Sequence, residues 1–303
     1  MPDAAAVRPP PTAAPASRVR PEPIRVDSPL VRRSRRIPLP RGAARGPGRA
    51  ARTCVQTRSP PRVIRAIVFD LDNTLTDFMR MKEAAIQAAI GGMIDAGIRM
   101  SRDELRERVR AVYDERGLEF QNVFDELLER EFGEVDPKIL ASGIVAYRRA
   151  RESELVLYPR AQMTLLELAK RGLKLGVVSD APRFQVWLRL CTLGLQHLFD
   201  AVVTFDDTGE RKPAAAPFRE VLRRLGVEPA ESLMIGDWAE RDVVGAKSLG
   251  MMTVFARYGD TFDTKESGAD YDVEDIFELV SIVGRLNGGD GSVGSHGGGP
   301  HGR

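Results

Sequence analysis

The sequence predicts a doubly wound parallel α/β sheet with an all-helical domain inserted after the first strand. From residue 158 onwards, apolar runs of strand length alternate with amphipathic helices, the pattern of a parallel sheet covered on both faces. Between residues 77 and 157 the apolar residues recur at helical spacing, so this segment is predicted to be helical. The first strand must join the same sheet, because a lone strand would leave its edges unpaired.

The two ends of the chain have compositions that predict no packed structure. Residues 1–62 are rich in Pro, Ala and Arg, and they cannot bury enough apolar surface to offset the entropy of ordering. Residues 287–303 are mainly Gly, Ser and His and are expected to form a flexible tail. For residues 1–62 the alternatives are an organelle transit peptide, an arm that binds nucleic acid or anionic lipid, and a start codon assigned too far upstream.

The overall composition indicates a soluble protein of a reducing compartment. Cys54 and Cys191 stand far apart with no CxxC pattern, which argues against a disulfide framework and a structural zinc site. No apolar run approaches the roughly 20 residues of a membrane helix, and no secretory signal follows the first methionine. The net charge of +2 does not imply nucleic-acid binding. We therefore expect a cytoplasmic protein that acts on small molecules.

The core is predicted to begin with residues 63–69, a β-branched apolar run of strand length. It leads into Asp70-Leu71-Asp72-Asn73-Thr74-Leu75, where two carboxylates one residue apart are followed by a tight polar turn. Two like charges held this close repel each other, so a bound cation, a shared proton or a basic neighbour must compensate. Of these three we expect the cation.

The inserted segment is predicted to hold four helices. They cover residues 79–96, 101–116, 120–132 and 137–152. The second helix starts at a capping box formed by Ser101 and Glu104, and Pro137 suits the first turn of the fourth. The charged side chains of this segment, Lys82 among them, are expected to lie mostly on solvated helix faces; the alternative for Arg80 or Lys82 is contact with a substrate beside the turn after the first strand.

The rest of the core, residues 158–286, is predicted to alternate helices with strands. The helices are expected over residues 160–170, 183–193, 217–225 and 241–249, and the strands over residues 173–178, 201–204, 233–236 and 253–255. The polar residues that follow three of the strands, Asp70, Ser179 and Asp237, can converge at one edge of the sheet.

Two further side chains are expected at this edge. Lys212 enters it from the loop after residue 204, and Asp242 follows Asp237 across a loop and the first turn of a helix. Mg²⁺ prefers hard oxygen ligands, so two or three carboxylates together with a phosphate oxygen suit it. No histidine or cysteine lies in these motifs, which disfavours zinc.

These residue types predict phosphoryl transfer. With the metal neutralising local charge, the Asp70 carboxylate could attack phosphorus and form an aspartyl phosphate. Asp72 could protonate the leaving oxygen and later take a proton from the water that hydrolyses the intermediate. Ser179 would donate a hydrogen bond to a phosphoryl oxygen, and Lys212 would offset the negative charge and fix Asp70.

The motifs resemble those of the haloacid dehalogenase (HAD) superfamily. Its four motifs are similar to Asp70–Leu75, Val177–Ser179, Lys212–Pro213 and Gly236–Asp242, in this order. The resemblance covers about residues 64–258 and implies a Rossmann-like core. It also implies that residues 77–157 form a type 1 cap, a helical bundle inserted between the first two motifs.

The same resemblance implies roles for the acidic residues. Asp70 would be the nucleophile and Asp72 the acid and base. The Asp70 side chain, the Asp72 backbone carbonyl and Asp237 would hold Mg²⁺, with Asp242 in support. Three details depart from the common pattern. Ala214-Ala215 follow Lys212-Pro213 where Asp-Pro is common, Arg160 stands where a small residue is usual, and Asp180 follows the second motif where Asn is frequent. Asp180 adds negative charge near a phosphate site and leaves the substrate preference open.

The predicted function is a Mg²⁺-dependent phosphomonoester hydrolase acting on a small phosphorylated metabolite. A phosphomutase is an alternative, because an aspartyl phosphate can pass its phosphoryl group to a sugar instead of water. A 2-haloacid dehalogenase is disfavoured by Asp72, because dehalogenation leaves no oxygen to protonate. A non-enzymatic binding protein that works through residues 1–62 is the remaining alternative. The sequence names neither the substrate nor the oligomeric state.

Overall fold

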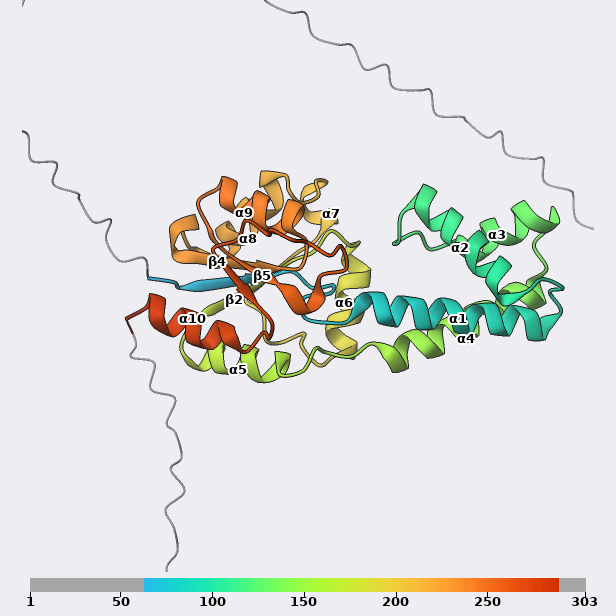
Figure 1. Ribbon diagram of the computed structural model, residues 1–303, viewed down its shortest axis with the longest axis horizontal. Coiled ribbons are helices and arrows are strands. Elements are labelled where there is room, and N and C mark those ends of the chain that lie inside the picture. The colour runs from blue at the N-terminus through green and yellow to red at the C-terminus, as the bar shows by residue number, and fades with distance from the viewer. Residues whose placement is uncertain (1–62, 289–303) are drawn as a thin grey trace, which may run out of the picture. The chain divides into compact units, whose positions relative to one another are not determined.

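The computed structural model describes residues 63–288, which form a sheet with helices on both faces and a helical insertion (Figure 1). The predictions for residues 1–62 and 289–303, and for Cys54, lie outside the described residues. Asn287, predicted to begin the tail, accepts a hydrogen bond from the Ile64 N–H at 2.7 Å and donates one to the Ile64 carbonyl at 2.8 Å. The packed core therefore reaches at least this residue.

The sheet is parallel throughout, and its strands lie in the order β3-β2-β1-β4-β5-β6. The strands are β1 (Ala66–Phe69), β2 (Lys174–Val178), β3 (Ala201–Val203), β4 (Ser232–Gly236), β5 (Met252–Ala256) and β6 (Tyr271–Val273). β1 pairs with β2 on one side and with β4 on the other, which confirms that the first strand joins the sheet. Phe69 lies level with Val177 and Ile235, so the carboxyl ends of these three strands meet at one edge.

Helices cover both faces of the sheet, as the alternating pattern predicts. On one face lie α5 (Ala161–Lys170), α6 (Arg183–Thr192) and α10 (Glu278–Leu286), and on the other lie α8 (Ala215–Leu225) and α9 (Val244–Ser248). Ile67 and Phe69 are buried in the first layer, and Ala66 and Val68 in the second. Because both faces are buried, β1 reads as a continuous apolar run. Short helical turns occur at α7 (Phe205–Thr208), Pro229–Glu231, Ala239–Val243 and Arg257–Gly259.

The inserted segment forms four helices. They are α1 (Phe78–Ala96), α2 (Arg102–Arg116), α3 (Val123–Phe132) and α4 (Pro137–Glu154), and α1 lies alongside α4 (Figure 1). The capping box at Ser101 and Glu104 is present, and Pro137 occupies the first turn of α4. The helices share their own apolar core, in which Ile90 of α1 and Leu127 of α3 are fully enclosed.

The expectation that Lys82 is solvated is wrong. Its ammonium donates hydrogen bonds to the Leu118 carbonyl at 2.9 Å and to Tyr147 Oη at 3.1 Å, and it lies 4.3 Å from the centre of the Tyr113 ring. Lys82 stands next to Met81 on the buried side of α1. A buried ammonium is tolerated there because oxygen acceptors and an aromatic face replace its water.

The insertion leaves and re-enters the core at neighbouring points. Thr76 and Leu157 face each other in an isolated antiparallel bridge, and the Tyr158 N–H donates to the Leu75 carbonyl at 3.0 Å. These contacts fix the chain on both sides of the segment predicted to be the cap. The start of the insertion is therefore tied directly to the turn that follows Asp70.

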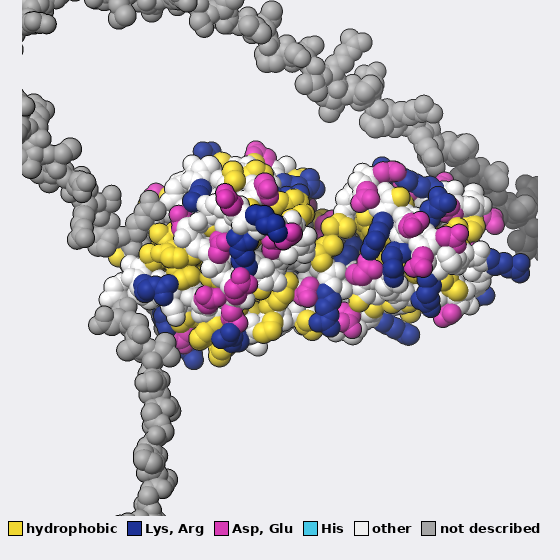
Figure 2. All heavy atoms as spheres, in the orientation of Figure 1, with side chains coloured by type: hydrophobic (Ala, Val, Ile, Leu, Met, Phe, Trp, Pro, Cys, Tyr) yellow, Lys and Arg dark blue, Asp and Glu magenta, His cyan; other side chains and the backbone are white. Residues whose placement is uncertain are grey.

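Charged side chains of both signs are interspersed over the face drawn in Figure 2. On the inserted helices many of them pair: Arg130 with Glu115 at 2.7 Å, and Arg116 with Glu126 at 3.1 Å. This mixture differs from the single-sign basic stripe that nucleic-acid binding uses. Within residues 63–288, no helix combines the length and the apolar character that crossing a membrane requires.

Candidate active site

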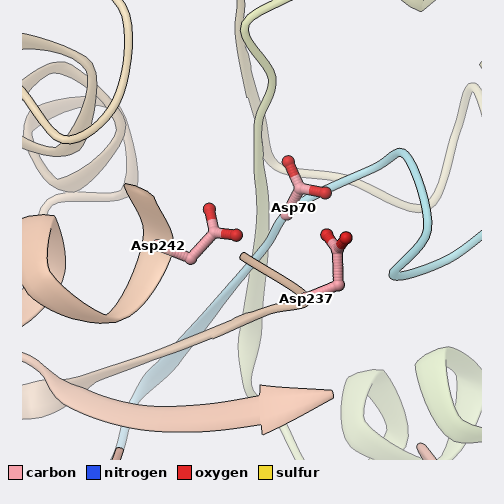
Figure 3. A group of neighbouring side chains, drawn as sticks. All are labelled: Asp70, Asp237 and Asp242. Atoms are coloured by element: carbon pink, nitrogen blue, oxygen red, sulfur yellow. The ribbon is translucent and has the colours of Figure 1, made fainter. Parts of the chain in front are cut away.

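Three carboxylates converge at the edge where β1 and β4 end. Asp70 follows β1, Asp237 follows β4, and Asp242 lies in the helical turn Ala239–Val243. Figure 3 shows the three side chains pointing toward one another, and one oxygen of each lies within 4.8 Å of the others. All three residues are buried. Asp70 and Asp237, two of the three strand-end residues expected to converge, lie together here.

A π-helical turn carries Asp242 into this group. The predicted helix over residues 241–249 is wrong at its start, because Val244 donates its N–H to the Ala239 carbonyl, five residues back. The Asp242 N–H donates to the Trp238 carbonyl at 2.8 Å, and the Trp238 N–H donates to Asp242 Oδ2 at 3.1 Å. These two bonds hold the Asp242 carboxylate beside the end of β4. Turns of this kind recur at functional sites and carry no sequence signal of their own.

Lys212 is the cation of this cluster. Its ammonium pairs with Asp70 Oδ1 and, at 2.6 Å, with Asp242 Oδ1, and its side chain is almost fully enclosed. Burial lowers the pKa of Lys212, but the carboxylates of Asp242 and Asp70 outweigh this effect and raise that pKa above its usual range. The lysine therefore stays charged and joins two of the three carboxylates.

The three carboxylates together fit a magnesium ion. Burial raises the pKa of Asp70 and of Asp237, and the neighbouring carboxylate of Asp242 raises both further. One lysine thus compensates only part of a group of three acids, and a divalent cation would lower these pKa values again. Carboxylate oxygens are the hard ligands that Mg²⁺ prefers, and no histidine or cysteine belongs to this group among the described residues.

Two glycines allow the loops of the site to approach one another. A Cβ atom on Gly236 would lie 2.2 Å from Asp242 Cγ, and one on Gly259 would lie 1.7 Å from the Asn73 carbonyl oxygen. Neither distance is compatible with a side chain. Asn73 itself adopts a left-handed conformation with φ of 60°, which Asn tolerates better than most residues. The tight turn after Asp70 is thereby held against the turn at Arg257–Gly259.

The Asp72 side chain lies outside the group of three carboxylates. Its Oδ2 accepts a hydrogen bond from Arg189 Nη1 at 2.7 Å, while its buried Oδ1 has no hydrogen-bond partner among the described residues. Burial raises the pKa of Asp72 to about 6, although the Arg189 guanidinium opposes this shift. Asp72 and Asp70 thus have different surroundings although only one residue separates them.

Arg189 is the site residue that the sequence analysis missed. It lies on α6, and its Nη2 donates at 2.6 Å to Glu119 of the inserted segment. A signal was present in the sequence, because Arg189 follows Val186 by three residues and precedes Leu190. It therefore shares the apolar face that α6 turns to the core, where an unpaired arginine is not expected.

Ser179 and Asp180 occupy the end of β2. Ser179 is buried, and its Oγ accepts a hydrogen bond from the Ala181 N–H at 3.2 Å, which leaves its hydroxyl hydrogen available to a ligand. Asp180 accepts the backbone N–H of Lys212 at 2.9 Å on one oxygen and Arg241 Nη1 at 3.1 Å on the other. The negative charge of Asp180 is therefore compensated and serves to hold the loop that carries Lys212.

The remaining residues singled out in the sequence lie at the margin. Trp238 packs under the Arg241 guanidinium, 3.6 Å from the ring centre, and its ring centre lies 4.4 Å from that of Phe262. Arg160 pairs with Asp275 near the start of α10 rather than with any residue of the inserted helices. Its backbone is left-handed, with φ of 64°, which explains why a small residue would be usual there.

A pocket of about 110 Å³ lies beyond Arg189, between the inserted helices and α6. Its polar lining includes Lys82, Arg151, Gln121 and Gln185, and Phe78 and Leu188 contribute apolar surface. None of the three clustered carboxylates lines this pocket, and Arg189 connects it to Asp72. Asp72 itself does not line the pocket, so Arg189 separates this pocket from the carboxylates of the site.

A family model and several curated relatives match this chain. The family model "haloacid dehalogenase-like hydrolase" matches residues 64–250, a range that includes all four motifs and the whole insertion. The glyceraldehyde 3-phosphate phosphatase of Methanocaldococcus jannaschii is 36% identical to this chain over 74% of it and 99% of the relative. That of Pyrococcus furiosus is 35% identical, over 78% of this chain and 100% of the relative.

Solved structures agree with this assignment. A HAD phosphatase from Thermococcus onnurineus is 30% identical, with a TM-score of 0.57 over 73% of this chain and 98% of its own. The HAD hydrolase YfnB from Bacillus subtilis, whose structure was solved with bound magnesium, shares the fold at 23% identity. Its TM-score is 0.55, over 73% of this chain and 99% of its own.

Proposed function

This chain belongs to the haloacid dehalogenase-like hydrolases and is a phosphatase of that family. On this premise we propose its catalytic residues and its class of substrate. The proposed reaction is hydrolysis of the phosphate monoester of a small metabolite through an aspartyl phosphate on Asp70. The observation that carries the proposal is the division of labour between Asp70 and Asp72. Asp70 lies among two carboxylates and Lys212, whereas Asp72 is held apart by Arg189.

In the first half of the reaction a carboxylate oxygen of Asp70 attacks phosphorus and the bond to the leaving oxygen breaks. Asp72 donates the proton that the leaving oxygen needs, so that an alcohol departs. A pKa near 6 suits this task, because part of Asp72 is protonated at neutral pH and can give up its proton readily. Lys212 holds the Asp70 carboxylate in place throughout.

In the second half a water molecule attacks the phosphorus of the aspartyl phosphate. Asp72, now ionised, takes a proton from this water, and the carboxylate of Asp70 is released with inorganic phosphate. The Ser179 hydroxyl and the Lys212 ammonium bind phosphoryl oxygens and stabilise the charge that develops on them. Protonation states and the Asp70 carboxylate are restored at the end of the cycle.

Mg²⁺ would be held by Asp70, Asp237 and the Asp72 backbone carbonyl, with Asp242 in support. When bound, it would neutralise charge on the carboxylates and on the phosphoryl group. The side chains of three of these residues already converge, which supports the assignment. The Asp242 carboxylate lies beside the other two carboxylates and also pairs with the Lys212 ammonium, so it can orient both.

Glyceraldehyde 3-phosphate is the first candidate substrate. Relatives in Methanocaldococcus jannaschii, Pyrococcus furiosus and other archaea carry this activity in their names, at 31–36% identity. The support for this candidate comes from these relatives, because the pocket beyond Arg189 is lined by none of the residues proposed to act on the phosphate.

The test is phosphate release by the full chain from D-glyceraldehyde 3-phosphate, dihydroxyacetone phosphate, glycerol 3-phosphate, p-nitrophenyl phosphate and pyrophosphate. We expect turnover with Mg²⁺, a preference for a triose phosphate, and loss of activity with EDTA. Asp70→Asn serves as the blank, because it keeps the shape of the site but removes the nucleophile. It also corrects for spontaneous loss of phosphate from the aldehyde.

Undiminished phosphate release by Asp70→Asn would disprove the proposed nucleophile. Two other readouts separate the alternatives. An isomerised sugar phosphate with little free phosphate would identify a mutase, and chloride release from 2-chloropropionate without metal would identify a dehalogenase.

A further inference from the structure

We propose that Arg189 is a positioning residue that couples docking of the cap segment 117–122 to the orientation of the Asp72 carboxylate. The inference rests on the proposed phosphatase function and goes beyond it. It assigns a task to an arginine outside the four motifs, and to Glu119, which lies 70 residues before it and on another part of the structure. Cap position and proton transfer would thereby depend on one another.

The guanidinium of Arg189 joins two carboxylates from different parts of the structure. Nη1 donates to Asp72 Oδ2 at 2.7 Å, and Nη2 donates to Glu119 Oε1 at 2.6 Å. Only 9% of the Arg189 side chain is exposed, and its charged group lies 4.4 Å from the centre of the Phe78 ring. A planar fork with fixed donors can hold two acceptors in a defined geometry, which a lysine cannot do.

The segment 117–122 is held at several points, so Glu119 is not a freely moving side chain. The Leu118 carbonyl accepts from buried Lys82 at 2.9 Å, and the Glu119 carbonyl accepts from Gln121 Nε2 at 2.6 Å. Gln185 of α6 donates to Gln121 Oε1 at 3.2 Å. Because Gln185 and Arg189 are four residues apart, one face of α6 receives the whole segment.

The consequence concerns the two oxygens of Asp72. Arg189 occupies Oδ2, while the buried Oδ1 has no protein partner among the described residues and is the atom left for proton exchange. While Glu119 holds the other end of the guanidinium, the Asp72 carboxylate cannot rotate without breaking a charged hydrogen bond. When segment 117–122 leaves α6, Arg189 loses one of its two anchors and Asp72 gains freedom. The proton donor is therefore fully positioned only with the segment docked.

The readout compares two leaving groups through kcat/KM, which reports the steps up to departure of the leaving group. An alkyl phosphate such as glycerol 3-phosphate needs a proton on its leaving oxygen, whereas p-nitrophenolate leaves with little assistance. For Arg189→Gln we expect kcat/KM on the alkyl phosphate to fall about 100-fold, the usual size of a general-acid contribution. On p-nitrophenyl phosphate the loss should be about tenfold smaller.

Glu119→Gln tests the coupling itself, since Glu119 does not touch Asp72. We expect it to lower the ratio of alkyl to aryl kcat/KM in the same direction, and to add nothing further when combined with Arg189→Gln. Arg189→Lys keeps the charge but reaches one carboxylate only. Its ratio of alkyl to aryl kcat/KM should therefore lie between that of Arg189→Gln and that of the wild type. This variant also keeps the inference testable if Arg189→Gln, which leaves the partly buried carboxylates of Asp72 and Glu119 unpaired, fails to fold.

Matched controls are Arg183→Gln, an exposed arginine on the same helix, and Glu129→Gln, an exposed glutamate of α3. Both should keep the wild-type ratio. Equal losses on both substrates in Arg189→Gln, or a wild-type ratio in Glu119→Gln, would overturn the coupling while leaving the phosphatase function standing. A wild-type enzyme without phosphatase activity on either substrate would instead overturn the proposed function.

Discussion

Lys212 and Asp242 form an ion pair with 2.6 Å between Nζ and Oδ1, and 3% and 2% of their side chains are exposed. The pair connects the third motif to the fourth, and Lys212 continues it to Asp70. A charged pair enclosed to this degree depends on both partners, because removal of one leaves the other buried and uncompensated.

Lys212→Met should therefore destabilise the protein by about 3–5 kcal/mol and lower kcat at least about 100-fold. Without the ammonium, three buried carboxylates repel one another. Added Mg²⁺ should then raise the melting temperature more in this variant than in the wild type. Thermal melts with and without Mg²⁺ measure the effect, and Lys170→Met, at an exposed position of α5, is the control. An equal response to Mg²⁺ in all three proteins would contradict this account.

Asp72→Asn should abolish turnover and leave magnesium binding largely intact. The amide keeps the shape of the side chain and can still accept from Arg189, but it cannot act as acid or base. The side chain of Asp72 is not part of the group of three carboxylates, and the family resemblance implies that its backbone carbonyl, not its side chain, holds the metal. Isothermal titration with Mg²⁺ checks this, with Asp237→Asn as the variant expected to lose binding. Loss of Mg²⁺ affinity in Asp72→Asn would place its carboxylate on the metal.

Gly236→Ala should weaken magnesium binding, because its Cβ would lie 2.2 Å from Asp242 Cγ and force this carboxylate away. The matched variant is Gly284→Ala in α10, where the new Cβ would meet only Arg171 Nη1 at 3.6 Å. That change should stabilise the fold by about 0.5–1 kcal/mol, as alanine does in helices. Denaturant unfolding and Mg²⁺ titration of both variants separate the two effects. Wild-type Mg²⁺ affinity in Gly236→Ala would refute the close approach.

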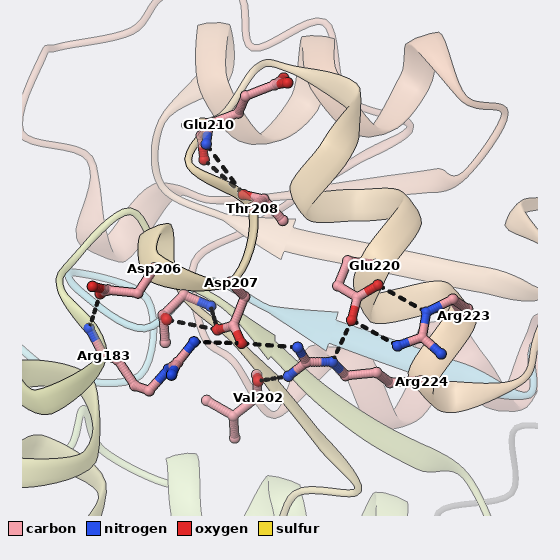
Figure 4. Close-up of polar contacts among 10 residues, drawn as sticks. Arg183, Val202, Asp206, Asp207, Thr208, Glu210, Glu220, Arg223 and Arg224 are labelled. Carbon is pink, nitrogen blue, oxygen red and sulfur yellow. Dashed lines mark hydrogen bonds and ion pairs between the residues drawn. The ribbon is translucent and has the colours of Figure 1, made fainter.

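Asp207 should make stability depend on pH between about 4 and 2. Burial opposes its ionisation, but hydrogen bonds from Thr204 and from Arg224, the latter drawn in Figure 4, outweigh this and lower the pKa of Asp207 to about 2. The folded pKa lies below the unfolded value of about 4. Its contribution is therefore complete above pH 4 and is lost as pH falls through 2.

The matching experiment is urea unfolding of the wild type and of Asp207→Asn from pH 7 down to pH 2. We expect the wild type to be more stable by about 1–2 kcal/mol at pH 7, the size of a charge-assisted hydrogen bond at a partly exposed site. The difference should shrink as the pH falls below 4. Arg223→Gln, which removes an exposed partner of Glu220 only, should not reproduce the change. A difference independent of pH would show that Asp207 acts by packing alone.

Much of the fold could be predicted from the sequence, because many elements depend only on residues that are neighbours along the chain. The run before Asp70 predicts a buried strand, and the capping box at Ser101 predicts a helix start, because each depends on neighbouring residues only. The short edge strand β6 escaped prediction, since three residues with an exposed Asp272 carry no clear alternation. The acidic cluster was predictable because parallel strands end at one edge, a rule of topology rather than of packing.

The features that could not be predicted depend on contacts between distant segments. The sequence predicts a solvated Lys82, but its ammonium donates to the Leu118 carbonyl and to Tyr147 Oη. The charge of Asp180 looked like a departure that would disturb a phosphate site, but Arg241 compensates it from 61 residues away. Such partners are set by the fold as a whole, and a single sequence does not name them.

The antiparallel bridge between Thr76 and Leu157 brings together the two ends of the inserted helical segment. Opposed residues in such a bridge lie about 5 Å apart, so a two-residue turn would close the chain if the insertion were removed. Closing a long loop costs only about 0.6 kcal/mol more for each doubling of its length. The sheet can therefore accept caps of very different size at this one point. We therefore expect that the insertion can be exchanged while the carboxylates and Lys212 stay where they are.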